Sequence, residues 1–195
     1  MQPWNFLTEY GDSAVTLPLA GATLVVLALG EARRMLHGWL LAVAACGLTV
    51  ALLKVGFSDC ADGGLLGRPF SPSGHTAMST LVYGGLAWLV SGGRGRAVRA
   101  LSTGAALALA LAIGVSRVVV HAHTPGEVVA GLGLGLLGLL LLQRVARGEA
   151  LRANVPGLLG VGVLVALLMH GTRWPIEPVL EHLGLLLHRT LPICG

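Results

Sequence analysis

The sequence predicts an all-α integral membrane bundle, a single domain of six transmembrane helices joined by short loops. Hydrophobic residues make up 54% of the 195 residues and charged residues only 11%, whereas a soluble domain carries about 25% charged residues. The apolar residues fall into six runs, each close to the roughly 20 residues that one membrane crossing needs. Basic residues gather in alternate loops between these runs. A soluble or disordered chain is excluded because too few charges remain to cover a water-facing surface.

The predicted elements follow one another with few residues between them. Ahead of the first helix, Trp4, Phe6 and Tyr10 indicate an interfacial anchor. The acidic Glu9 and Asp12 in the same stretch argue against a signal peptide, which has a basic start. The six helices are expected near residues 13–30, 36–57, 74–90, 98–120, 126–142 and 155–170. Residues 172–195 form the last predicted element, a short interfacial segment with several leucines.

The basic residues predict the orientation of the bundle. The loops after the first, third and fifth helices carry 8 of the 13 basic residues: Arg33, Arg34, Arg94, Arg96, Arg99, Arg144, Arg147 and Arg152. These loops should therefore be cytoplasmic and both termini extracytoplasmic. The net charge of +4 follows from this topology, so no nucleic-acid partner is expected. Because all but one of the basic residues are arginine, we expect a GC-rich bacterial source and a bacterial inner membrane.

Chemistry-bearing residues stand at helix ends that should share one side of the membrane. An up-and-down chain brings the end of each even-numbered helix and the start of each odd-numbered helix to the same face. The residues at these ends are Lys54, Ser73, Gly74, His75, Arg117, His123 and Glu127. Ionisable groups at membrane depth are costly and usually functional. The sequence therefore predicts one site on the extracytoplasmic side, facing the periplasm or the cell exterior.

Several of these residues suit the binding of a phosphate group. Free backbone N–H groups at the predicted helix start around Ser73 and Gly74, together with the helix dipole, form an anion pocket. Arg117 can hold two phosphate oxygens, and Lys54 and Arg68 add positive charge. The histidines add a reactive group, because His123 and Glu127 are four residues apart and can meet on one helical turn.

A carboxylate on one imidazole nitrogen fixes the tautomer and leaves the other nitrogen free to attack. His75 then remains as an acid, whereas His121, two residues from His123, need not face the site. Cations, an amide pocket and two histidines together predict a phosphate-ester hydrolase.

Two motifs carry a family resemblance. The segment Pro72-Ser73-Gly74-His75, followed by Ser116-Arg117-x5-His123-x3-Glu127, resembles the second and third signature motifs of the type 2 phosphatidic acid phosphatase family. These are six-helix membrane lipid phosphatases, related to soluble bacterial acid phosphatases and vanadium haloperoxidases. The resemblance implies that His123 forms a phosphohistidine, that Glu127 orients it and that His75 protonates the leaving oxygen. The residues implied to hold the phosphoryl oxygens are Ser73, Gly74, Arg117, Lys54 and Arg68. No metal and no cofactor are implied.

The chain departs from the family pattern at two places. The family has aspartate where this chain has Glu127, which shifts the carboxylate by one methylene. The first family motif is Lys-x6-Arg-Pro, but here 13 residues separate Lys54 from Arg68. The loop is rearranged, or one of these two cations is not the family equivalent.

The predicted function is hydrolysis of a lipid phosphate monoester or diphosphate, of the undecaprenyl diphosphate, phosphatidate or phosphatidylglycerol phosphate type. Its partners are this lipid and the bilayer, and the sequence leaves the oligomeric state open. Three alternatives remain: a metal-dependent membrane hydrolase, an intramembrane serine protease built on Ser73, and a lipid or anion carrier that uses the same cation cluster for binding only. Cys60 and Cys194 fall on the same predicted oxidising face, which makes a disulfide between them a hypothesis.

Overall fold

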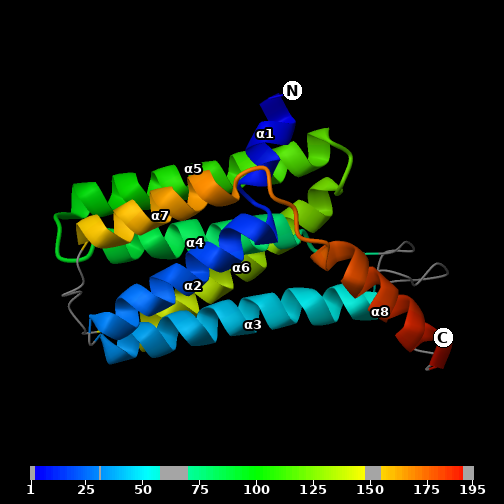
Figure 1. Ribbon diagram of the computed structural model, residues 1–195, viewed down its shortest axis with the longest axis horizontal. Helices are drawn as coiled ribbons and strands as arrows, with labels where there is room; N and C mark the ends of the chain where they lie inside the picture. Colours follow the sequence, from blue (N-terminus) through cyan, green and yellow to red (C-terminus); the bar gives the residue numbers. More distant parts are fainter. Residues whose placement is uncertain (1–2, 31, 58–69, 148–154, 191–195) are drawn as a thin grey trace.

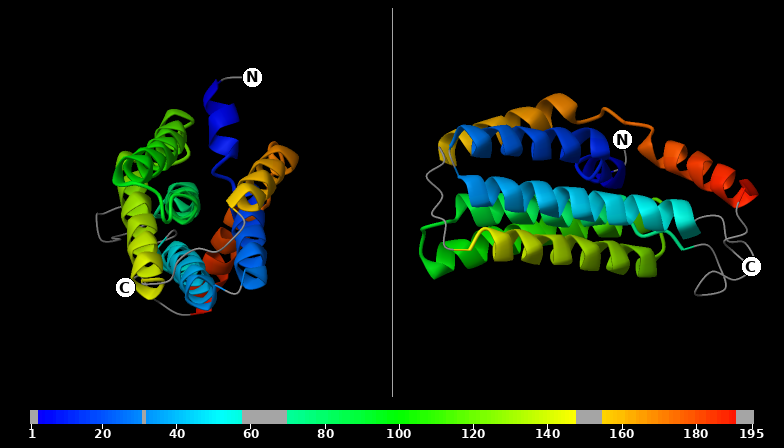
Figure 2. Two further views of the ribbon diagram at one scale, coloured as in Figure 1. Left: turned by 90° about the vertical axis from the view of Figure 1, so that its left-hand side faces the viewer. Right: turned by 90° about the horizontal axis from the view of Figure 1, so that it is seen from below.

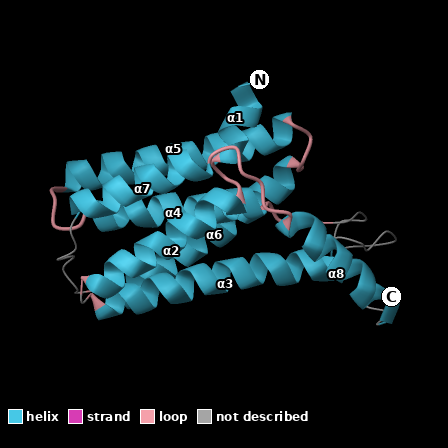
Figure 3. Cartoon of the chain, in the orientation of Figure 1, coloured by secondary structure: helices cyan, strands magenta, loops and turns pink. Residues whose placement is uncertain are grey.

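A computed structural model describes residues 3–30, 32–57, 70–147 and 155–190. Throughout these residues the secondary structure is helical, with no strand (Figure 3). The predicted all-α class is thereby confirmed for the described part of the chain. The eight helices are α1 (Pro3–Glu9), α2 (Ser13–Leu29), α3 (Arg33–Phe57), α4 (Gly74–Val90), α5 (Arg96–Val119), α6 (Pro125–Val145), α7 (Val155–Met169) and α8 (Ile176–Thr190).

Helices α2 to α7 run up and down along one axis, and α8 extends beyond the ends of α3 and α4 (Figure 1). The turns from α2 to α3 and from α4 to α5 therefore lie at one end of the bundle. The end of α3, the start of α4, the end of α5 and the start of α6 lie at the opposite end, beside the start of α8. Chain alternation thus brings segments far apart in the sequence to one end.

Helix α4 is the centre of the bundle, in contact with α2, α3, α5, α6 and α7 (Figure 2). Its backbone lies close to that of α6 because glycines face it. A Cβ atom added at Gly135 would lie 2.5 Å from the carbonyl oxygen of Ala77, and one added at Gly131 would collide with the carbonyl oxygen of Ser73. Small residues let membrane helices approach to backbone contact. The indole N–H of Trp39 donates to the carbonyl oxygen of Ala20 at 3.0 Å, which links α3 to α2.

Four described segments are long and apolar enough to cross a membrane: Pro3–Leu29, which comprises α1 and α2, Arg33–Gly56, Arg96–Val119 and Pro125–Val145. Helix α4 has 17 residues and α7 has 15, both short for a crossing. The chain is therefore a membrane protein by helix length and composition. Six crossings, and the placement of both termini outside the cytoplasm, stay predictions.

Most helices begin or end within three residues of the expected bounds. Helices α3 and α5 begin at Arg33 and Arg96, ahead of the expected 36 and 98, because arginine is a good helix former that a hydropathy pattern does not count. The anchor segment itself is helical, as α1. Helix α8 occupies Ile176–Thr190 of the predicted interfacial segment. Arg68, Cys60 and Cys194 lie outside the described residues.

Candidate active site

Glu127 joins three segments at the start of α6. Thr124 caps this helix by accepting a hydrogen bond from the backbone N–H of Glu127 at 3.4 Å, and Glu127 Oε2 accepts from the N–H of Thr124 at 2.8 Å. The same oxygen lies 3.3 Å from Nδ1 of His123, and Oε1 accepts from the N–H of Ser71 at 2.9 Å. A single carboxylate therefore orients the imidazole and fixes the segment that leads into α4.

The turn after α5 places Arg117 next to His123. The carbonyl oxygen of Arg117 accepts hydrogen bonds from the N–H groups of Ala122 at 3.0 Å and His123 at 3.2 Å. His121 takes the left-handed conformation in this turn, with φ of 57°, which few non-glycine residues adopt. Its side chain is exposed. The five-residue spacing between the arginine and the histidine is thus the length of one reversing turn.

Three predicted site residues converge on a carboxylate that the sequence did not indicate. Glu177, at the start of α8, lies 2.8 Å from Nζ of Lys54, 3.4 Å from Arg117 and 3.7 Å from Nε2 of His123. The side chain of Lys54 is only 6% exposed and that of His123 only 5%. The nearby imidazole of His123 and ammonium of Lys54 hold the pKa of Glu177 well below its usual range, although burial acts in the opposite direction. These groups form an anion-binding cluster, occupied by the protein's own carboxylate.

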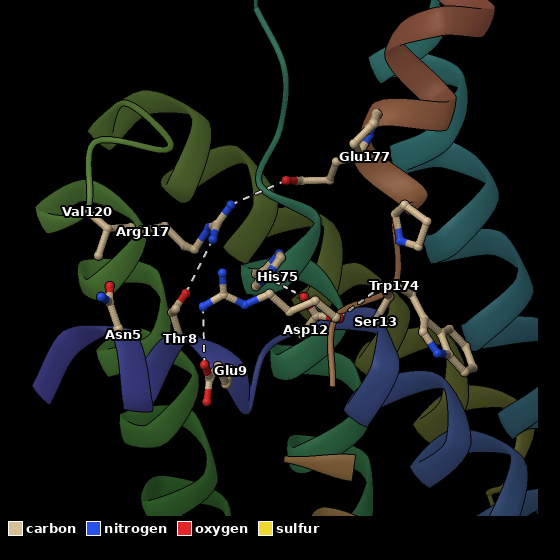
Figure 4. A pocket seen from close by; sticks show the side chains of 13 residues that line it. Asn5, Thr8, Glu9, Asp12, Ser13, His75, Arg117, Val120, Trp174 and Glu177 are labelled. Carbon is tan, nitrogen blue, oxygen red and sulfur yellow. Dashed lines mark hydrogen bonds and ion pairs between the residues drawn. The ribbon is translucent and has the colours of Figure 1, made fainter. Parts of the chain in front are cut away.

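His75 lies beside Asp12. Its Nε2 is 3.6 Å from Oδ2 of Asp12, within ion-pair range for a protonated imidazole. Asp12 caps α2 through its other oxygen, which accepts from the N–H of Ala14 at 2.8 Å. Figure 4 shows His75 beside Asp12, and Arg117 between Glu177 and Thr8 of α1. Asp12 is thus held in place by the helix that it caps.

The start of α4 uses its polar groups in two different ways. The hydroxyl of Ser73 is fully buried and caps the helix by accepting from the N–H and the hydroxyl of Thr76, at 3.3 and 3.0 Å. Its N–H donates to the carbonyl oxygen of Glu127 at 3.0 Å. By contrast, the buried Oγ of Ser71 and Nε of Arg117 have no hydrogen-bond partner among the described residues. Buried donors normally have partners, so these two indicate a place for a polar ligand.

Three cavities meet at the start of α8. One of about 320 Å³ is lined by Lys54, Ser71, Arg117, His123, Glu127 and Glu181, among others. A second, of about 470 Å³, is lined by Asp12, His75 and Arg117, among others. A third, of about 190 Å³, is mainly apolar and is lined by Gly74, His75, Val50, Met78 and Leu180, among others. Glu177 lines all three cavities.

The sequence missed Asp12, Ser71 and Glu177 as site residues. Asp12 carries only the signal of a helix cap, and Ser71 stands next to a motif without belonging to it. The acidic position of Glu177 in the first turn of an amphipathic helix is what the helix dipole alone favours. Among the described residues, no three His, Cys, Asp or Glu side chains lie close enough to hold a metal ion.

The sequence was compared with protein-family models, with curated proteins and with solved structures. A family model described as PAP2 superfamily matches residues 35–149, a range that contains Lys54, His75, Arg117, His123 and Glu127. The chain is 31% identical over 187 residues to a Klebsiella pneumoniae protein described as "Uncharacterized 22.5 kDa protein in cps region", covering 93% of this chain and 90% of that protein. No solved structure matches the chain.

Proposed function

The chain belongs to the PAP2 superfamily, a family of phosphatases that act on phosphate esters, and from this premise we propose that it hydrolyses a lipid phosphate monoester or diphosphate through a phosphohistidine on His123. The observation that carries the proposal is the anion cluster. Lys54, Arg117 and His123 surround one carboxylate, and a phosphoryl group needs the same surroundings: positive charge, multiple donors and an adjacent nucleophile.

In the first step, neutral His123 donates its Nδ1–H to Glu127, which leaves the lone pair on Nε2. This nitrogen attacks phosphorus and forms an N–P bond while the bond from phosphorus to the leaving oxygen breaks. His75, which this step requires in its protonated form and which has Asp12 at 3.6 Å, gives its proton to that oxygen. Lys54 and Arg117 stabilise the charge on the remaining phosphoryl oxygens.

In the second step, a water molecule attacks phosphorus and gives a proton to the now neutral His75. The N–P bond breaks, its electron pair returns to Nε2 of His123, and inorganic phosphate leaves. His75 is then protonated again and the cycle closes. Asp12, 3.6 Å from the ring, is assigned as the residue that positions His75 and favours its protonated form.

A lipid substrate on the extracytoplasmic side is the finer part of the proposal. The apolar cavity between α2, α3, α4 and α8 adjoins His75 and Lys54, which suits an ester with an apolar chain. The arginine-bearing turns lie at the other end of the bundle, which by the positive-inside rule favours a site outside the cytoplasm.

The test is release of inorganic phosphate by the detergent-purified full chain. The panel is undecaprenyl diphosphate, phosphatidate and phosphatidylglycerol phosphate, each with and without EDTA. We expect release from at least one lipid that persists in EDTA. Loss of release in EDTA would favour the metal-dependent hydrolase, and binding without release would favour the carrier.

Two histidine variants test the assignment within the same turn. His123→Ala should abolish turnover, because it removes the nucleophile. His121→Asn is the matched control, because asparagine tolerates the left-handed conformation of that position, and it should keep most of the activity. Equal loss in both variants would refute the assignment of His123.

A further inference from the structure

We propose that Glu177 is a displaceable gate: α8 holds its carboxylate in the phosphate site, and the phosphate group of the substrate must take its place. The inference rests on the proposed function, since it requires that Lys54, Arg117 and His123 bind a phosphate group. The structure then represents a closed state, in which the protein's own carboxylate competes with substrate.

The first argument is charge and distance. The carboxylate of Glu177 lies 2.8 Å from Lys54 and 3.4 Å from Arg117, and its Oε1 is 3.7 Å from the His123 nitrogen that would attack phosphorus. A phosphate ester carries one or two negative charges. Placed on the same cations, it would stand within a few ångströms of the carboxylate, where like charges repel strongly because a protein screens them less than water does. Phosphate and Glu177 therefore exclude each other.

The second argument is that Glu177 lines the cavities of both histidines. His123 lines the cavity of about 320 Å³, whereas His75 lines the cavities of about 470 and 190 Å³. Hydrolysis requires that both histidines reach the same phosphate group, one on each side of phosphorus. Glu177 lines all three cavities. Its movement away from the site would therefore connect the cavity beside His123 with the cavities beside His75, as the reaction requires.

The third argument is the weak attachment of α8 to the bundle. The helix packs mainly on α3. Among its residues whose burial is described, only Gly184 is buried, while Val179, Leu183 and Leu186 are about half exposed. Elements with little buried apolar surface open at low free-energy cost. The ion pairs of Glu177 therefore account for much of what holds the start of α8 over the site.

The chain ahead of α8 is tethered, so the movement is confined to the helix. Glu9 of α1 lies 3.2 Å from Arg173 and 3.4 Å from His170, which ties the start and the middle of the short connection between α7 and α8 to α1. The opening expected is a swing of α8 about residues 174–175. The pKa of Glu177 lies well below its usual range, so the carboxylate stays charged at neutral pH and leaves by displacement rather than by protonation.

The experiment measures binding of inorganic phosphate to the full chain in detergent, by isothermal titration calorimetry. Three proteins are compared: wild type, Glu177→Gln and His182→Gln. His182 is on the same helix, is exposed, and is not among the residues that line the three cavities, so its variant is the control for a glutamine substitution on α8. Thermal unfolding of each protein checks that it is folded.

If the gate exists, Glu177→Gln binds phosphate about tenfold more tightly than wild type or better, because a site that is mostly closed lowers the apparent affinity by its open fraction. His182→Gln stays within about twofold of wild type. Adding Lys54→Ala to Glu177→Gln removes the gain. In the phosphate-release assay, Glu177→Gln lowers KM and leaves kcat near the wild-type value.

Unchanged or weaker phosphate binding by folded Glu177→Gln would overturn the gate, and so would the absence of phosphate binding by both wild type and Glu177→Gln. Either result leaves the proposed function to be judged by lipid hydrolysis itself. Conversely, tighter phosphate binding without hydrolysis of any lipid would support the gate on an anion site and count against the proposed phosphatase substrate.

Discussion

Replacing Glu127 with glutamine tests whether this carboxylate sets the tautomer of His123. The carboxylate accepts from the N–H groups of Thr124 and Ser71 and lies 3.3 Å from Nδ1 of His123. Glutamine has a single acceptor oxygen, so it cannot serve both backbone donors and the imidazole. With its NH₂ group toward His123, Nδ1 becomes an acceptor and the proton moves to Nε2. The predicted nucleophilic nitrogen is then blocked.

The expected loss follows from that change of tautomer. An acid-to-amide change beside a catalytic histidine, with the geometry kept, costs about 10⁴ in kcat in a serine protease. Because the contact to His123 is 3.3 Å rather than short, we expect roughly 10³-fold to 10⁴-fold, which corresponds to about 4 to 5.5 kcal/mol of activation free energy. The free energy of unfolding should fall by only about 1 to 3 kcal/mol, the cost of one unsatisfied buried donor.

The assay is kcat for phosphate release from the preferred lipid, with rapid-quench labelling of the protein by phosphate. The variant should form little phosphohistidine while inorganic phosphate still binds, since the cations are unchanged. Gly133→Ala, on the same helix with nothing within 4 Å of the added Cβ, is the matched control and should keep kcat. If Glu127→Gln keeps more than a tenth of wild-type kcat, Glu127 does not set the tautomer.

Three further outcomes are expected. Gly131→Ala places a methyl group against the carbonyl oxygen of Ser73 at the start of α4, and such overpacking costs about 1 to 3 kcal/mol. Differential scanning calorimetry should therefore show a lower Tm for Gly131→Ala than for Gly133→Ala. Equal Tm values would contradict the close packing of α4 and α6. Asp12→Asn removes the carboxylate that favours protonated His75, so kcat should fall and the alkaline limb of the pH profile of kcat should move to lower pH. A lower kcat with an unshifted alkaline limb would mean that Asp12 only caps α2. The lowered pKa of Glu177 means that its ionised form stabilises the fold above the unfolded pKa of about 4.3, with loss as pH falls through the lower folded value. Thermal unfolding of wild type and Glu177→Gln should therefore differ at neutral pH and converge on acidification.

The sequence predicts the helices best where their ends carry local signals. Helix α4 starts at Gly74 because Ser73 caps it, and Pro72 precedes the cap. Helix α6 starts at Pro125 because Thr124 and Glu127 form a capping box. The hydropathy pattern places the start of α3 three residues too late, because charged residues such as Arg33 end an apolar run although arginine favours a helix. Helix caps involve residues at most four positions apart, so they can be recognised in a single sequence.

Other features were decided only by the packing of the bundle. The carboxylate of Glu177 meets Lys54 across 123 residues, and Ser71 reaches Glu127 across 56. Whether the hydroxyl of Ser73 is a buried helix cap also depends on what packs around it.

By itself the sequence determined that this is an all-helical membrane protein, because composition and hydrophobic periodicity are read along the chain. Two of its short motifs also resemble those of a known phosphatase family. The tertiary structure decided which groups share the site with those motifs. It brought Asp12 to His75 and Glu177 to His123, contacts that depend on how α1, α2 and α8 pack at the end of the bundle. The sequence does not show which cation a given carboxylate will pair with, because the distance between the two groups is set by folding.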